Sequence, residues 1–263
     1  QQHQKWKRLI EEECQKFNLQ NRPELLFKYT LDRLYHQGVR VLVVDNPKFP
    51  KDQLSTLEKK IKRINWNIGR PRKLMSNPKL FGNGYFRDLD KNYTRTVFQG
   101  PRTRVRKDHL VNEDFTNPLI EVQEGFRTGF LQGQDFGENR CFIFGSSLAY
   151  SYGCEEQHTL SAFLQKESYF QGYTVLNRGI RGSDSYNTCL ALLKGQFRSG
   201  DLVILFGFNP INREHKPLLK ENYNFLDLGQ LFQRPHNYGD VFIDAQNHLS
   251  PRGYQAVAQK INI

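Results

Sequence analysis

Hydrophobic positions along the chain follow two patterns, which predict alternating strands and helices. Continuous apolar runs that end at glycine, proline or a polar loop predict buried strands at residues 39–44, 141–145, 173–177 and 201–207. Apolar residues at helical spacing predict helices at residues 24–37, 158–166 and 186–197. This alternation has the spacing of βαβ units, so the sequence predicts an α/β fold with a central parallel sheet and helices on both faces.

The strength of this pattern divides the chain into two regions. Residues 1–118 are expected to form a basic N-terminal region, in which a Lys-rich helix at about 52–64 precedes loops with short strands. Residues 119–263 are expected to form the main α/β domain. The helix and strand at 24–44 either fold onto the same sheet or belong to a preceding domain.

No apolar run approaches the roughly 18 residues that a membrane-spanning helix needs, so no transmembrane segment is expected. The first residues also lack the apolar segment of a secretory signal, which slightly favours a cytoplasmic location and leaves the compartment open. The cysteines form no C-x-x-C pair and have no histidine at zinc-ligand spacing, so neither a metal nor another cofactor is expected. We expect Cys141 and Cys189 to be buried thiols, and one disulfide stays open.

Positive charge is concentrated in the first half of the chain. Residues 141–263 hold 11 Lys and Arg against 10 Asp and Glu, so residues 1–140 carry about +10 of the net +11. Basic runs occur at Lys59, Lys60, Lys62 and Arg63, at Arg70, Arg72 and Lys73, and at Arg102, Arg104, Arg106 and Lys107. They form either a solvated surface or a face that binds a polyanion such as an anionic glycan, lipid headgroups or nucleic acid.

The loops that follow the predicted strands carry residues suited to acyl transfer. This chemistry needs a hydroxyl nucleophile, donors for the developing oxyanion, and a base that a carboxylate orients. Ligands of parallel sheets bind outside the carboxyl ends of the strands, where these loops lie. The residues that fit the roles are Ser147 as nucleophile, Gly182 and Asn209 as oxyanion donors, and His248 with Asp244 as base and orienting carboxylate.

Each of these residues also has an ordinary explanation. Gly-Ser-Ser after a strand is commonly a turn, Gly182 allows an unusual backbone angle, and Asn209 precedes a proline as turn residues do. His248 precedes a helix start, with Ser250 as N-cap and Pro251 in the first turn. Their joint occurrence in this order favours the catalytic interpretation.

The four segments F-G-S-S-L, N-R-G-I-R-G, F-G-F-N and D-A-Q-N-H-L-S-P-R-G-Y resemble, in order, the sequence blocks of the SGNH (GDSL-type) hydrolase family. The resemblance covers roughly residues 119–263. The stretch V-Q-E-G-F-R before the first block also resembles the N-x-x-G-F-R lead-in of bacterial members. This resemblance implies a three-layer α/β/α, flavodoxin-like fold with a basic N-terminal extension.

The resemblance also implies a role for each site residue. Ser147 is the nucleophile, and its backbone N–H is the first oxyanion donor. The backbone N–H of Gly182 and the side-chain amide of Asn209 complete the oxyanion hole. His248 is the general base, with Asp244 as its partner.

The chain departs from the family pattern in several places. Ser146 stands where Asp is common, and Pro210 replaces the Asp that follows the third-block Asn. Asp244 lies four positions before His248 instead of three, although a helical turn brings such residues onto one face. The roughly 34 residues between the third block and Asp244 are too few for the fourth helix and strand of the family. The unit at 24–44 has the character of that missing unit.

From the site residues and the resemblance we expect a serine esterase that removes a small acyl group, most plausibly O-acetyl, from a carbohydrate. One alternative is an acyltransferase that uses the same residues to acylate a glycan. Another is a catalytically silent module whose basic N-terminal half binds a polyanion.

Overall fold

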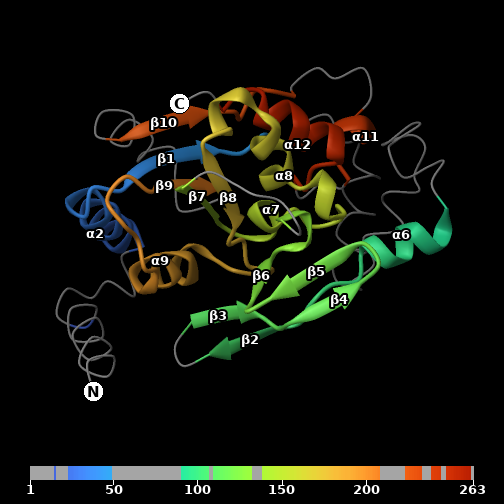
Figure 1. Cartoon of the computed structure of the whole chain (residues 1–263), viewed down its shortest axis with the longest axis horizontal. Helices are drawn as coiled ribbons and strands as arrows, with labels where there is room; N and C mark the ends of the chain where they lie inside the picture. Colours follow the sequence, from blue (N-terminus) through green and yellow to red (C-terminus); the bar gives the residue numbers. More distant parts are fainter. Residues whose placement is uncertain are drawn as a thin grey trace, which may run out of the picture.

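The protein is an α/β structure built on one large, mostly parallel sheet. The computed structural model describes residue 15 and residues 23–48, 90–106, 109–131, 138–207, 223–232, 238–243 and 247–261. The sheet has eight strands in the order β10-β1-β9-β7-β8-β6-β5-β4 (Figure 1). The strands from β10 to β8 run parallel, which confirms the predicted parallel sheet.

Four of the five parallel strands, all except β10, coincide closely with the apolar runs of the sequence. The five strands are β1 (Arg40–Asp45), β7 (Asn139–Phe144), β8 (Tyr173–Asn177), β9 (Leu202–Phe206) and β10 (Asn224–Asp227). Every residue of β9 is buried, as expected of a central parallel strand with both faces covered. Adjacent residues of β9 face opposite sides of the sheet, so the strand contributes to two separate cores.

Helices cover both faces of the sheet. On one face, α7 (Ser147–Tyr150), α8 (Leu160–Lys166) and α12 (Pro251–Ala258) pack with the side of β9 that carries Ile204. On the other, α2 (Pro23–His36) and α9 (Ser185–Lys194) pack with the side that carries Val203. Shorter elements complete this part of the chain: η4 (Glu156–His158), η5 (Ser168–Phe170) and α11 (Tyr238–Val241).

The far end of the sheet is antiparallel, which the sequence pattern did not predict. There β4 (Phe115–Asn117), β5 (Ile120–Gln123) and β6 (Phe126–Arg127) form a meander joined to β8, followed by η3 (Gly129–Leu131). A separate hairpin consists of β2 (Thr103–Arg106) and β3 (His109–Asn112). The short strands expected before residue 118 are therefore present.

One helix in this region was not expected. Helix α6 (Lys91–Val97) begins at Asp90, whose carboxylate accepts hydrogen bonds from the N–H groups of Asn92 and Tyr93. This cap starts a short helix in a segment with little apolar periodicity. The Lys-rich helix expected at 52–64 lies outside the described residues.

The N-terminal helix and strand join the main sheet, which is the first of the two arrangements considered. Strand β1 lies between β9 and β10 and pairs in parallel with both. The segment after the third block, expected to be too short for a fourth helix and strand, contains the short strand β10, and residues 208–222 before it lie outside the described residues. Only four residues long and polar at both ends, β10 lacks the apolar run that marks a buried strand.

The described cysteines are buried thiols. Cys141, Cys154 and Cys189 are all buried, as expected for the first and last of them, whereas Cys14 lies outside the described residues. Burial raises the pKa of the Cys141 and Cys154 thiols well above the ordinary value. Among the helices that the structure describes, none is long and apolar enough to cross a membrane.

Candidate active site

Ser147 lies in the first turn of α7, immediately after the central strand β7. Gly145 makes the sharp turn between them, with a φ of 151° that favours glycine. A Cβ at Gly145 would lie 1.8 Å from the carbonyl oxygen of Phe206, so no larger residue fits beside the end of β9. Ser146 then occupies the N-cap position without a side-chain cap bond, and Ser147 follows half-buried at the carboxyl end of the sheet.

His248 lies just before α12 in a segment held by main-chain hydrogen bonds. The carbonyl oxygen of His248 accepts a bond from the Ile243 N–H at 2.9 Å. Ser250 caps α12 by accepting from the Gly253 N–H, and Pro251 occupies the first turn, as predicted. His248 is buried, with 8% of its surface exposed to solvent.

The fold brings these two side chains into direct contact. Ser147 Oγ lies 2.7 Å from His248 Nε2, a hydrogen-bonding distance. In the tautomer with an unprotonated Nε2, the hydroxyl donates to the ring. The Tyr254 hydroxyl, from α12, donates to the Leu148 carbonyl in α7 at 2.9 Å, so the two helices that flank the pair are joined directly.

Gly182 lies in the loop after β8, which runs alongside the turn that carries Ser147. The Ile180 N–H donates to the Gly145 carbonyl at 3.0 Å. Gly179 packs so tightly on α7 that a Cβ there would lie 2.1 Å from the Tyr150 nitrogen. Gly182 itself has a φ of 68°, and a Cβ at this residue would meet nothing within 4 Å. The loop therefore presents Gly182 next to open space.

The other two predicted site residues, Asn209 and Asp244, lie outside the described residues. The strand that leads to Asn209 ends beside the nucleophile turn, since Ser146 Oγ donates to the Gly207 carbonyl at 3.2 Å. Asp244 directly follows Ile243, whose N–H bonds to the segment of His248.

Arg127 is a residue near the site whose role sequence reasoning missed. Its side chain is fully buried and donates to the carbonyl oxygens of Tyr150, Ser151 and Cys154 at 3.1, 3.2 and 2.8 Å. Its Nε donates to Glu156 Oε1 at 2.8 Å. Burial lowers the pKa of Arg127, but the Glu156 carboxylate together with Tyr150 and Cys154 outweighs this effect and leaves the pKa raised. Arg127 thus remains charged and fixes the chain that follows α7.

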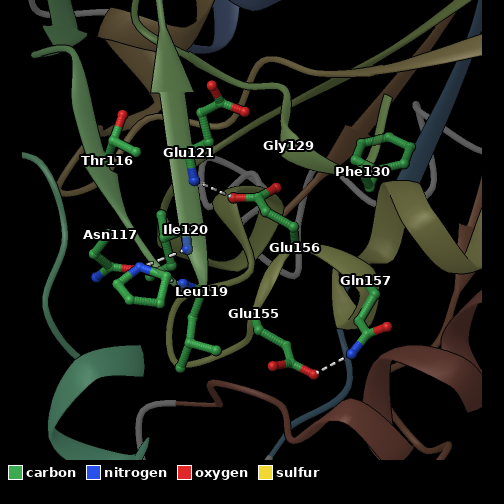
Figure 2. A pocket seen from close by; sticks show the side chains of 11 residues that line it. Thr116, Asn117, Leu119, Ile120, Glu121, Gly129, Phe130, Glu155, Glu156 and Gln157 are labelled. Atoms are coloured by element: carbon green, nitrogen blue, oxygen red, sulfur yellow. Dashed lines mark hydrogen bonds between the residues drawn. The ribbon is translucent and has the colours of Figure 1, made fainter. Parts of the chain in front are cut away.

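Glu156 also lines a pocket of about 370 Å³ on the meander side of the molecule (Figure 2). Figure 2 shows its carboxylate pointing to the backbone nitrogen of Glu121, which donates to Oε1 at 2.9 Å. Glu155 and Gln157 line the same pocket, and their side chains are hydrogen-bonded to each other. Neither Ser147 nor His248 lines it, so this pocket is separate from the Ser147–His248 pair.

The basic runs are described only in part. Arg102 and Arg104 are exposed around the start of β2, whereas the runs at 59–63 and 70–73 lie outside the described residues. Within the described part of the chain, no three His, Cys, Asp or Glu side chains are grouped as a metal site. Comparison of the chain with protein-family models, curated proteins and solved structures gave no match.

Proposed function

We propose that the protein is a serine esterase with an SGNH-type site that removes a small acyl group from a carbohydrate. The observation that carries this proposal is the 2.7 Å contact between Ser147 Oγ and His248 Nε2 at the carboxyl end of the parallel sheet. This edge is where α/β proteins bind their ligands. A hydroxyl in contact with an imidazole is the pairing that nucleophilic catalysis uses.

In the proposed reaction, His248 Nε2 takes the hydroxyl proton of Ser147 while Oγ attacks the ester carbonyl carbon. The tetrahedral intermediate collapses as the bond to the alcohol oxygen breaks, and His248 returns the proton to the leaving alcohol. Water then attacks the acyl-enzyme with the same proton transfers. This second half releases the carboxylic acid and restores Ser147.

The oxyanion is stabilised by the backbone N–H groups of Ser147 and Gly182 and by the amide of Asn209. The open space beside Gly182 and the course of its loop along the Ser147 turn support the second donor. The carboxylate of Asp244 orients the far nitrogen of His248. The helices on both faces of a mostly parallel sheet support the three-layer, flavodoxin-like arrangement of this family.

A polar substrate is favoured over a lipid by the character of the described surface. Its large hydrophobic side chains with high exposure are Tyr35, in α2, and Val105, in the β2–β3 hairpin. Neither belongs to the elements that carry Ser147 and His248. An O-acetyl group on a sugar fits such a surface better than a long acyl chain does.

Acyl transfer to a sugar hydroxyl uses the same residues and differs only in what accepts the acyl group. The Ser147–His248 contact favours both enzymatic functions over a silent binding module, which needs no such pair. Turnover of p-nitrophenyl acetate and of acetylated glycans, with product identification, tests all three. Free acetate identifies the esterase, and an acetylated acceptor identifies the transferase. Absence of both products with every substrate contradicts the proposal.

A further inference from the structure

Arg181 holds a guanidinium group against the Tyr152 ring, which in turn neighbours the ring of His248. Its backbone N–H donates to Asn112 Oδ1 at 3.1 Å, and its Nη1 donates to the Pro101 carbonyl at 2.9 Å. The guanidinium carbon lies 5.0 Å from the centre of the Tyr152 ring. The bond to Asn112 holds the backbone, and the contacts with Pro101 and the Tyr152 ring hold the side chain.

Tyr152 connects this guanidinium to the candidate site. Its ring centre lies 5.1 Å from that of His248, and its backbone N–H donates to the Ser147 carbonyl at 3.0 Å. The Arg181 guanidinium and the His248 imidazole therefore both contact one aromatic ring. A substrate that extends from Ser147 past the Tyr152 ring reaches this positive charge.

The charge of Arg181 is not neutralised by the protein around it. Among the described residues, Arg181 forms no ion pair, whereas Arg127, Arg140 and Arg252 each pair with an Asp or Glu. The partners of its guanidinium are instead a carbonyl oxygen and two aromatic rings. A half-buried guanidinium without a carboxylate partner is well suited to bind an anion.

A hydroxyl group without a hydrogen-bond partner lies next to the Arg181 guanidinium. The Tyr150 hydroxyl is buried and has no hydrogen-bond partner within the described part of the chain. A Cβ built on Gly100 would lie 2.4 Å from Arg181 Nη1 and 3.6 Å from the Tyr150 hydroxyl, so both groups border the same glycine. The surroundings of Arg181 thus contain a hydrogen-bond donor that the protein itself does not use.

Positive side chains continue from this point along the β2–β3 hairpin. Pro101, the acceptor for Arg181, directly precedes Arg102, and Arg104 follows two positions later; both arginines are exposed. Arg104 lies in β2, and Arg102 directly precedes the strand. A chain of anionic groups bound at Arg181 can therefore extend along the hairpin.

We propose that Arg181 is a specificity-determining residue that binds a carboxylate of the substrate, and that the substrate is an acylated acidic polysaccharide whose further uronate units lie along β2. This inference rests on the proposed esterase function and specifies its substrate class. The planar guanidinium matches a carboxylate through two parallel N–H···O bonds, which a neutral sugar lacks.

The test compares acetylated polygalacturonate, which is acidic, with acetylated xylan, which is neutral. In Arg181→Met the acidic-to-neutral ratio of kcat/KM should fall about 10- to 100-fold, mainly through KM, since a hydrogen bond to a charged group is lost. The control is Arg198→Met, which removes an exposed arginine before β9, at the opposite end of the parallel strands. In this control the ratio should stay as in the wild type.

A second variant displaces Arg181 without altering it. Gly100 does not have a positive φ, so its backbone accepts alanine. In Gly100→Ala the new Cβ must push Nη1 away, and the acidic-to-neutral ratio should fall in the same direction. An unchanged ratio in Arg181→Met, or an equal loss on both substrates, overturns the inference and leaves the esterase function standing.

Binding measured without turnover separates this inference from the proposed function. Calorimetric titration of Ser147→Ala protein with oligogalacturonate should give binding that Ser147→Ala/Arg181→Met loses and that high salt weakens. If the wild type shows no hydrolysis but this binding is present and depends on Arg181, the esterase proposal fails and the carboxylate site stands. No binding of oligogalacturonate, or binding of sulfated dextran alone, overturns the carboxylate assignment.

Discussion

Ser147 Oγ and His248 Nε2 lie 2.7 Å apart, although 101 positions separate the two residues in the sequence. Ser147 is placed by the end of β7 and the turn at Gly145, and His248 by the segment that precedes α12. The hydrogen bond from Tyr254 to the Leu148 carbonyl holds the two parts together. The geometry of the pair therefore depends on how α12 packs on α7.

Tyr254→Phe should weaken this connection. The variant keeps the buried ring and removes one of the two donors to the Leu148 carbonyl, which still accepts from the Ser151 N–H, so it should cost about 0.5–1.5 kcal/mol of unfolding free energy. The kcat for p-nitrophenyl acetate should also fall. Tyr169→Phe removes an exposed hydroxyl that accepts from Arg40 and is the control for both measurements. Equal effects of the two variants in urea unfolding and in kcat would contradict this role of Tyr254.

Glu156→Gln should destabilise the segment after the nucleophile. Arg127 is fully buried, and this variant removes the carboxylate that neutralises it, so the unfolding free energy should fall by about 3 kcal/mol or more. Denaturant unfolding measures the change. Lys28→Gln, in an exposed ion pair with Asp32, is the control and should cost less than about 1 kcal/mol. A similarly small change for Glu156→Gln would show that the buried pair does not stabilise this segment.

Gly179→Ala should displace the loop that carries Gly182. The added Cβ would lie 2.1 Å from the Tyr150 nitrogen, and overpacking of this kind costs about 1–3 kcal/mol. We expect lower thermal stability and a lower kcat, because the loop moves relative to Ser147. Gly172→Ala is the matched control, since a Cβ there meets nothing within 4 Å. Wild-type kcat in Gly179→Ala would argue that this loop does not serve the reaction.

Cys154 should resist thiol reagents in the folded protein. Burial raises the pKa of its thiol, so at pH 8 the reactive thiolate is scarce, and the buried sulfur is also inaccessible. Iodoacetamide followed by peptide mass spectrometry should show little modification of Cys154 or Cys141 until urea unfolds the chain. Modification of native Cys154 at the rate of a free thiol is the contrary result.

The sequence predicted the parts of the fold that rest on local pattern. The apolar runs marked β7, β8 and β9 to within two residues, because central parallel strands are buried on both faces. Ser147 and His248 could be paired because each lies in a segment with a recognisable turn or cap. Strand β10 was not predicted, because it lies at the edge of the sheet and its residues show no clear alternation of buried and exposed positions.

Residues that act through distant backbone contacts could not be found this way. Arg127 contacts carbonyl groups 23 to 27 positions away, and nothing in the composition around it signals these acceptors. The same holds for Arg181, whose acceptor Pro101 lies 80 positions earlier. Only the packing of the meander and the hairpin against the strand ends reveals either role.

The serine-esterase mechanism requires that Ser147 is an activated nucleophile. A fluorophosphonate probe followed by peptide mass spectrometry should show one adduct, on Ser147, in the wild type. The adduct should be absent in Ser147→Ala and form far more slowly in His248→Ala, since a serine hydroxyl without its base is a weak nucleophile. An unmodified Ser147 in the folded wild-type protein, or labelling as fast without His248 as with it, would contradict the serine-esterase mechanism.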